Sequence, residues 1–194
     1  MSTVLPHRAS DAFLELALAG ERSHAVRMAT DLVDDGFPLP TVLTDVVGAA
    51  QSEVGRRWQR AELNVADEHL VTGISQAALA ALTTNGHRRR RGGWARGRHH
   101  GVEVANAVVA CAEGDWHALP SQMFAESLRA VGVGVLHLGA SVPAADVGAL
   151  LERRRPDGLV VTSNLPLSYL GVASLADAAH RFGVPVLAGG RALT

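Results

Sequence analysis

The first 85 residues carry apolar side chains three or four positions apart, the spacing of an amphipathic helix. Helices are expected over residues 10–20, 21–35, 38–58 and 65–84. In the last of these, Leu70, Ile74, Ala77 and Ala81 are predicted to face inward. Because the connections between the segments are short, neighbouring helices should run antiparallel, and this part of the chain is predicted to form a four-helix bundle.

The pattern changes beyond residue 101, where short and nearly continuous apolar runs alternate with amphipathic segments. Strands are expected at residues 104–110, 134–138, 159–162 and 184–188, and helices at 120–131, 143–153 and 169–182. Strands buried on both faces and joined by helices form a parallel sheet, so this half is predicted to be a doubly wound α/β domain. The sequence stops just after the fourth strand, and we expect the last strand and helix of such a domain to be missing. Either the sheet is short or another chain covers its open edge.

Residues 86–101 separate the two patterns and hold six arginines and five glycines. We interpret them as a linker between a helical domain at residues 1–85 and an α/β domain at residues 102–194. Clustered arginine beside Trp94 also suits a nucleic-acid-binding arm, although a charged run is more often a solvated segment.

Composition excludes several classes of chemistry. All 18 basic residues are arginine, so neither a lysine Schiff base nor the lysine of a P-loop is available. Cys111 is the only cysteine, which excludes an intrachain disulfide. The net charge is −1, and no apolar run approaches the length of about 20 residues that a membrane span needs. We expect a cytoplasmic protein without membrane attachment.

The residues that follow the strands form the strongest functional signal. They are Gly114, Asp115 and His117 after the first strand, Gly139 and Ser141 after the second, Ser163-Asn164-Leu165 after the third, and Gly189-Gly190 after the fourth. In an open α/β sheet these positions share one rim, where ligands bind. A histidine that binds a metal usually donates its second ring nitrogen to a carboxylate, and Asp115 is placed to accept from His117. A serine hydroxyl at this rim is expected to bond to a ligand or to His117.

These motifs, in this order, resemble the cobalamin-binding domain of methionine synthase, corrinoid methyl-carrier proteins and cobalamin mutases. That pattern is Asp-x-His-x-x-Gly, then Ser-x-Leu, then Gly-Gly, on a flavodoxin-like or Rossmann-like fold. The resemblance implies that His117 is the lower ligand of cobalt and that Asp115 steadies it. It implies cofactor contacts from the following residues: Gly114, Trp116, Leu119, Gly139, Ser163, Leu165, Gly189 and Gly190. Pro120 stands where the pattern has a glycine.

The helical half carries a second resemblance. Trp58, followed after the next helix start by Glu68-His69, is similar to the helical cap of the adenosylcobalamin photoreceptor repressors. The resemblance implies that these three side chains meet the upper face of the cofactor. From the residues alone, Trp58 also fits the end of a core stripe, and Glu68 fits a favourable charge at a helix N-terminus with His69 in solvent.

The resulting functional prediction is a non-catalytic, light-responsive cobalamin sensor that prefers adenosylcobalamin, with methylcobalamin as the other possible form. Because no helix-turn-helix region precedes residue 10, we expect it to act through a partner regulator or a homo-oligomer rather than by binding nucleic acid directly. The alternative is a corrinoid methyl carrier for a methyltransferase. A nucleic-acid binder using residues 88–98 is a third hypothesis, and a catalytic mutase is disfavoured because no substrate barrel is present. No residue is assigned a catalytic role.

Overall fold

The protein is described by a computed structural model that covers residues 8–89 and 105–193. The chain divides into two compact units, Met1–Gly92 and Gly93–Thr194, each with its own internal packing. The division falls inside the predicted linker at 86–101. Residues 86–89 of that segment continue the preceding helix, and the rest of it, with most of the predicted arginine-rich arm, lies outside the described residues. Within the described ranges, no helix is both long and apolar enough to cross a membrane.

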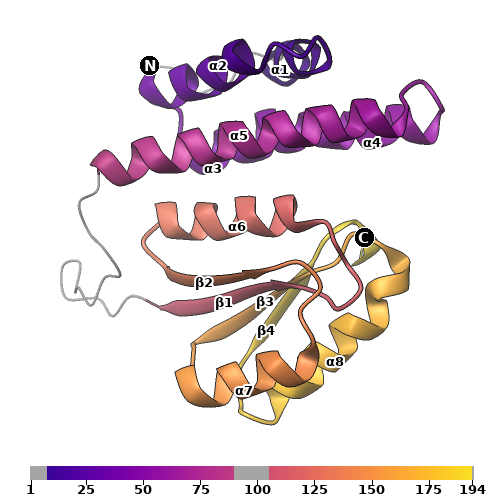
Figure 1. The fold of residues 1–194 in the computed structure, drawn as a ribbon. Coiled ribbons are helices and arrows are strands. Elements are labelled where there is room, and N and C mark those ends of the chain that lie inside the picture. Colours follow the sequence, from indigo (N-terminus) through magenta and orange to yellow (C-terminus); the bar gives the residue numbers. More distant parts are fainter. Residues whose placement is uncertain (1–7, 90–104, 194) are drawn as a thin grey trace. The chain divides into compact units, whose positions relative to one another are not determined.

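The first unit is helical (Figure 1). Its elements are α1 (Ala9–Leu18), α2 (Arg22–Asp34), α3 (Leu39–Val42), η1 (Leu43–Gly48), α4 (Ala49–Gln59) and α5 (Val65–Arg89). The π-helical stretch η1 joins α3 to α4 without leaving helical backbone angles, so these three elements form one continuous helix. The unit is therefore the predicted bundle of four helices, and its predicted bounds hold within two residues except that α5 extends to Arg89.

The predicted inward face of α5 is partly wrong. Ile74 is buried, but Leu70 is 41 % exposed, and its neighbour Val71 is fully buried instead. Ala77 and Ala81 are only partly buried, whereas Ala78, Leu79 and Leu82 line the core. The helix is thus turned by about one position relative to the predicted face.

The second unit is a four-stranded parallel sheet in the order β2-β1-β3-β4, with helices on both faces. Its elements are β1 (Asn106–Cys111), α6 (Ala118–Ala130), β2 (Gly134–Gly139), α7 (Ala144–Arg154), β3 (Gly158–Thr162), η2 (Pro166–Ser168), α8 (Tyr169–His180), β4 (Val186–Gly189) and η3 (Arg191–Leu193). The predicted doubly wound α/β fold is confirmed, with every predicted strand and helix in place.

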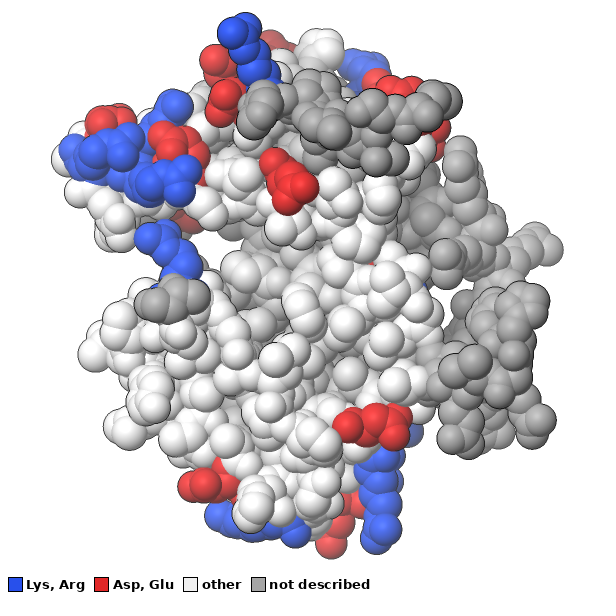
Figure 2. All heavy atoms as spheres, turned by 180° about the vertical axis from the view of Figure 1, so that it is seen from behind, with Lys and Arg blue, Asp and Glu red and all other residues white. Residues whose placement is uncertain are grey.

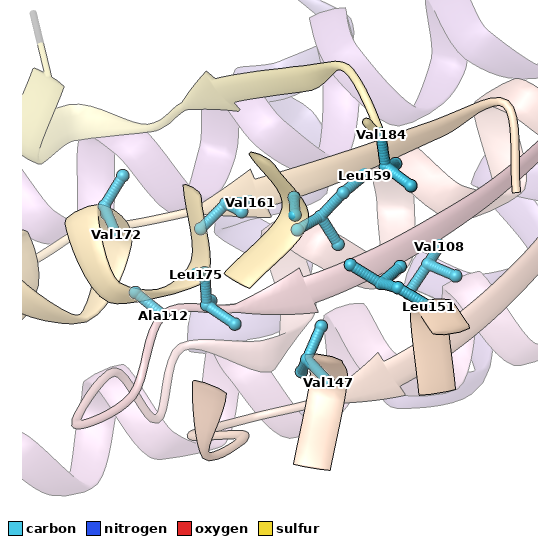
Figure 3. Packing of buried hydrophobic residues seen from close by; sticks show 10 residues of the cluster. Val108, Ala112, Val147, Leu151, Leu159, Val161, Val172, Leu175 and Val184 are labelled. Atoms are coloured by element: carbon cyan, nitrogen blue, oxygen red, sulfur yellow. The ribbon is translucent and has the colours of Figure 1, made fainter. Parts of the chain in front are cut away.

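Two apolar clusters hold this sheet. On one face Val109, Val135 and Val160 pack with Ala125 of α6. On the other face α7 and α8 pack against the strands, as Figure 3 shows. That larger cluster consists of Val108, Ala112, Val147, Leu151, Leu159, Val161, Val172, Leu175, Ala179 and Val184. The strands read as continuous apolar runs because both of their faces are covered.

The start of α8 is fixed by a close backbone approach. A Cβ added at Gly171 would lie 2.6 Å from the carbonyl oxygen and 2.8 Å from the amide nitrogen of Glu113. Only glycine lets α8 pack this closely against the end of β1, which carries the loop that leads to Asp115 and His117.

We predict that Gly171→Ala lowers the free energy of unfolding of the α/β unit by about 3 kcal/mol, the upper part of the range for overpacking, because backbone cannot give way as a side chain does. The matched control is Gly148→Ala on α7, where the new methyl group would meet Ala178 and Phe182 at 3.6 and 3.7 Å, ordinary contact distances. Calorimetry of both apo variants measures the shift. An equal effect of the two substitutions would contradict the close-approach explanation.

Candidate functional site

The loop between β1 and α6 is organised around the buried carboxylate of Asp115, which is 0 % exposed. Its Oδ1 accepts the backbone N–H of His117 at 2.9 Å and lies 2.8 Å from Nδ1 of the same residue. Its Oδ2 accepts the backbone N–H of Asn164 at 2.5 Å, from the loop that follows β3. The carboxylate therefore orients an imidazole and ties two strand ends together.

Burial by itself raises the pKa of Asp115, but the hydrogen bonds from the Asn164 and His117 amides and from the His117 ring outweigh it and hold that pKa below its ordinary value. Asp115 is thus ionised at neutral pH and can only accept hydrogen bonds. The short contact with Nδ1 then places the proton of neutral His117 on Nδ1, and the Nε2 lone pair is left to bind a metal.

His117 precedes α6, and its side chain is 51 % exposed at the rim of the sheet. Among the residues that the structure describes, none hydrogen bonds to its Nε2. Pro120 is the third residue of α6, where the backbone N–H has no acceptor within the helix. Proline in place of the family's glycine therefore fits the helix start that follows His117.

The loop after β2 is bound to the same carboxylate-bearing loop. Ser141 donates its backbone N–H to the carbonyl oxygen of Asp115 at 2.9 Å, and its hydroxyl accepts the N–H of Gly114 at 3.1 Å. Gly114 and Gly139 take left-handed backbone angles, with φ of 85° and 86°, which favour glycine. The three strand ends β1, β2 and β3 are thereby joined into one rim.

At the end of β4, the two glycines have different roles. A Cβ at Gly190 would lie 2.1 Å from the carbonyl oxygen of Ser163, and its φ of 122° also requires glycine. At Gly189 an added Cβ meets nothing within 4 Å. Gly190 thus allows the loops after β3 and β4 to approach each other, whereas Gly189 keeps the rim open.

The remaining predicted rim residues differ in exposure. Trp116 is 75 % exposed and Leu165 is 39 % exposed, so both present apolar surface, while Leu119 is buried under the loop. Ser163 is fully buried, and its hydroxyl lies 2.8 Å from that of Ser168. The expected hydrogen bond from a serine at the rim to His117 is therefore not formed by Ser163.

In the helical unit, Trp58 lies near the end of α4, and Glu68 and His69 lie near the start of α5. Trp58 is 49 % exposed, so it does not close the core stripe. Glu68 Oε2 lies 2.5 Å from Nδ1 of His69, and Oε1 accepts the hydroxyl of Thr72 at 2.8 Å. An indole face and an oriented carboxylate–imidazole pair are thus available to a ligand.

Polar side chains of α4 and α5 lie beside this pair. The Thr72 hydroxyl lies 3.2 Å from Oε1 of Gln51, whose amide donates to the buried hydroxyl of Ser75 at 2.9 Å. Neither Gln51 nor Thr72 is among the residues predicted from the sequence. Thr72 was predictable from the sequence, because it follows Glu68 by one helical turn.

Ion pairs surround the end of α4. Glu53 accepts hydrogen bonds from Arg57 and Arg56, which hold its pKa below the ordinary value, and Arg60 pairs with Glu62 at 2.6 Å. On the face shown in Figure 2, basic and acidic side chains likewise lie in small mixed groups. Each of the arginines beside Trp58 is thus paired with a carboxylate.

The site offers few side chains that could bind a metal ion. In the described ranges, no three His, Cys, Asp or Glu side chains gather to hold a metal ion. At the rim the chain presents one oriented imidazole, which suits a metal that arrives already held by other ligands.

A parallel α/β domain with an Asp–His pair at the strand ends, preceded by a four-helix bundle, defines the class of corrinoid-binding proteins. Comparison with known proteins agrees. Residues 9–83 and residues 105–194 each match a family model described as a B12 binding domain. The chain belongs to this family and is a cobalamin-binding protein.

Two individual similarities add detail. The chain is 31 % identical over 193 residues to the HTH-type transcriptional repressor CarH of Myxococcus xanthus, a match that covers 96 % of this chain and 60 % of that protein. The monomethylamine corrinoid protein of Methanosarcina barkeri shares the fold, with a TM-score of 0.77 and 18 % identity over 96 % of this chain and 86 % of that one.

We predict that Asp115→Asn lowers the free energy of unfolding of the apo protein by about 2 kcal/mol at pH 7, because an amide cannot accept at both oxygen positions. The folded pKa of Asp115 is depressed, so the stabilisation by its carboxylate is complete above the unfolded pKa and is lost as the pH falls through the folded pKa. The difference between wild type and variant should therefore shrink on acidification. Urea unfolding across this pH range measures it, with the exposed Asp177→Asn as control. A difference in free energy of unfolding between wild type and Asp115→Asn that is independent of pH would contradict an ionised Asp115.

Proposed function

We propose that this protein is a non-catalytic, light-responsive sensor that binds adenosylcobalamin, with His117 as the protein ligand of cobalt. The observation that carries the proposal is the geometry of His117: Nδ1 is bonded to a buried carboxylate, and Nε2 is available at an exposed rim. Carboxylate–histidine pairs of this kind fix the tautomer and raise the basicity of a metal ligand.

The residues at the rim fit the cofactor. A corrin supplies the equatorial nitrogens itself, so a single imidazole is the donor that the protein has to add. The open space beside Gly189 and the apolar surfaces of Leu165 and Trp116 would accept the nucleotide tail and the edge of the ring. Gly114 and Gly139 have no side chains, so the backbone would lie close to the cofactor at these two positions.

Trp58, Glu68 and His69 are assigned to the upper ligand. The exposed indole of Trp58 offers a flat apolar face, and Glu68 offers a carboxylate that can accept a ribose hydroxyl. The Thr72 hydroxyl holds that carboxylate in place before any ligand binds. Similarity to a transcriptional repressor supports a regulatory role over a catalytic one.

When bound, adenosylcobalamin supplies a weak cobalt–carbon bond that light breaks. Trp58 and Glu68 would contact only the adenosyl-bearing state, and such a difference in contacts is what shifts a conformational equilibrium. This conformational shift would change the number of subunits in the homo-oligomer or the affinity for a partner regulator.

We predict that His117→Ala weakens cobalamin retention at least about tenfold, the scale on which disturbed ligation changes metal affinity. Its absorption spectrum should change from that of histidine-ligated cobalt to that of cobalt bound by water or by the cofactor's own base. His180→Ala, at an exposed position on α8, is the control. Unaltered binding and spectrum in His117→Ala would refute the assignment of the cobalt ligand.

We predict that green light changes both the spectrum and the oligomeric mass of protein reconstituted with adenosylcobalamin in the dark. Trp58→Ala and Glu68→Gln should reduce the change in mass while leaving histidine ligation intact, because they act on the upper ligand. Mass measured by light scattering before and after illumination tests this, with the exposed Glu15→Gln as control. Identical mass and spectrum in both states would rule out the light-sensor function. Methyl transfer from bound methylcobalamin to a methyltransferase would instead favour the methyl-carrier alternative.

A further inference from the structure

A second polar network adjoins the His117 loop and does not include Asp115. It joins Ser121 in the first turns of α6 to His137 on β2 and to Cys111 at the end of β1. Ser121 and Cys111 are fully buried, and His137 is half-buried. Figure 1 shows α6 lying over β1 and β2, the strands that carry the other two residues.

The direction of each hydrogen bond in this network follows from the number of protons. The Ser121 hydroxyl donates its one proton to the carbonyl oxygen of Ala118 at 2.7 Å. It must therefore accept from its other neighbours, which are Nε2 of His137 at 2.9 Å and Sγ of Cys111 at 3.3 Å. His137 thus carries its proton on Nε2.

His137 is suited to a neutral donor role. Burial lowers its pKa, and the nearby charge of Arg129 lowers it further, against a smaller opposing effect of Glu126. A neutral ring with the proton on Nε2 donates to Ser121 without adding charge beneath the loop.

The network holds the backbone on the carboxyl side of His117. Ser121 binds the Ala118 carbonyl, and Sγ of Cys111 also lies 3.7 Å from the His117 carbonyl oxygen. The Thr162 hydroxyl donates to the same sulfur at 3.5 Å, which adds a link to β3. Asp115 holds the ring and the N–H of His117, whereas the Ser121 hydroxyl holds the carbonyl of the next residue, Ala118.

Packing alone does not account for these polar residues. His137 projects to the face of the sheet that α6 covers, where Val135 and Val109 of the neighbouring positions are buried among apolar side chains. An apolar residue would fill such a place at no desolvation cost, while a half-buried imidazole stabilises the fold little in net terms. What the imidazole adds is a directed hydrogen bond.

We propose that His137 is a positioning residue for the cobalt ligand: through Ser121 it fixes the first turn of α6 and thereby the direction in which His117 presents Nε2. This inference rests on the proposed function, in which His117 binds cobalt.

The test uses the full chain loaded with adenosylcobalamin. His137→Leu removes the donor, and His137→Gln keeps an N–H donor at nearly the same reach, so the two variants form a matched pair. Ser121→Ala removes the hydroxyl with little risk to folding, because alanine favours the helix. The readouts are the cobalamin dissociation constant and the absorption spectrum, with apo unfolding measured separately.

We expect His137→Leu and Ser121→Ala each to weaken binding about tenfold, as for other partners that orient a metal ligand, and to move the spectrum toward that of His117→Ala. His137→Gln should stay within about twofold of wild type, and the double variant His137→Leu/Ser121→Ala should be no worse than either single variant, because both break one network.

Wild-type binding and spectrum in His137→Leu and Ser121→Ala, even with lowered apo stability, would overturn the positioning role while leaving the cobalt ligand intact. A loss in His137→Gln equal to that in His137→Leu would also overturn it, since the donor would then be irrelevant. If His117→Ala itself retains the wild-type spectrum, the proposed function fails, and the positioning role fails with it.

Discussion

The buried carboxylate of Asp115 is the contact on which the rim of the sheet depends. Burying a charge is costly unless it is hydrogen-bonded, and here three donors from two loops satisfy it. The same bonds fix the path of the loop after β1, its distance from the loop after β3 and the tautomer of His117. Removing the charge would therefore disturb the shape of the site and its chemistry together.

Periodicity was sufficient to predict the elements, because short apolar runs and helical stripes differ clearly in this chain. It failed on the orientation of α5, where apolar residues occur in adjacent pairs such as Leu70-Val71, Ala77-Ala78 and Ala81-Leu82. Two neighbouring stripes fit the same pattern, and only the packing against α1, α2 and α4 selects the one that is buried.

The Asp115–His117 pair was predictable because a carboxylate two residues before a histidine can reach it within one loop. The contacts of Asn164 and Ser141 with that loop were not, since they join segments far apart in sequence through backbone groups that every residue has. The polar partner Gln51 was hidden for a similar reason, because its acceptor and donor lie on another helix.

The two units hold the side chains that are proposed to contact the ligand to different degrees, and this difference fits the proposed sensor. Around His117 the ring, the N–H and the carbonyl of the next residue, Ala118, are each held by buried partners, so this proposed cobalt ligand would change little between states. Trp58 and His69 are largely exposed, and only Glu68 is braced. Under the proposed function, a cofactor that loses its upper group would keep its bond to His117 and release its contacts with Trp58 and His69. Since only contacts that differ between two states can shift an equilibrium, the proposed sensor would generate its signal through Trp58 and His69 while His117 retains the cofactor.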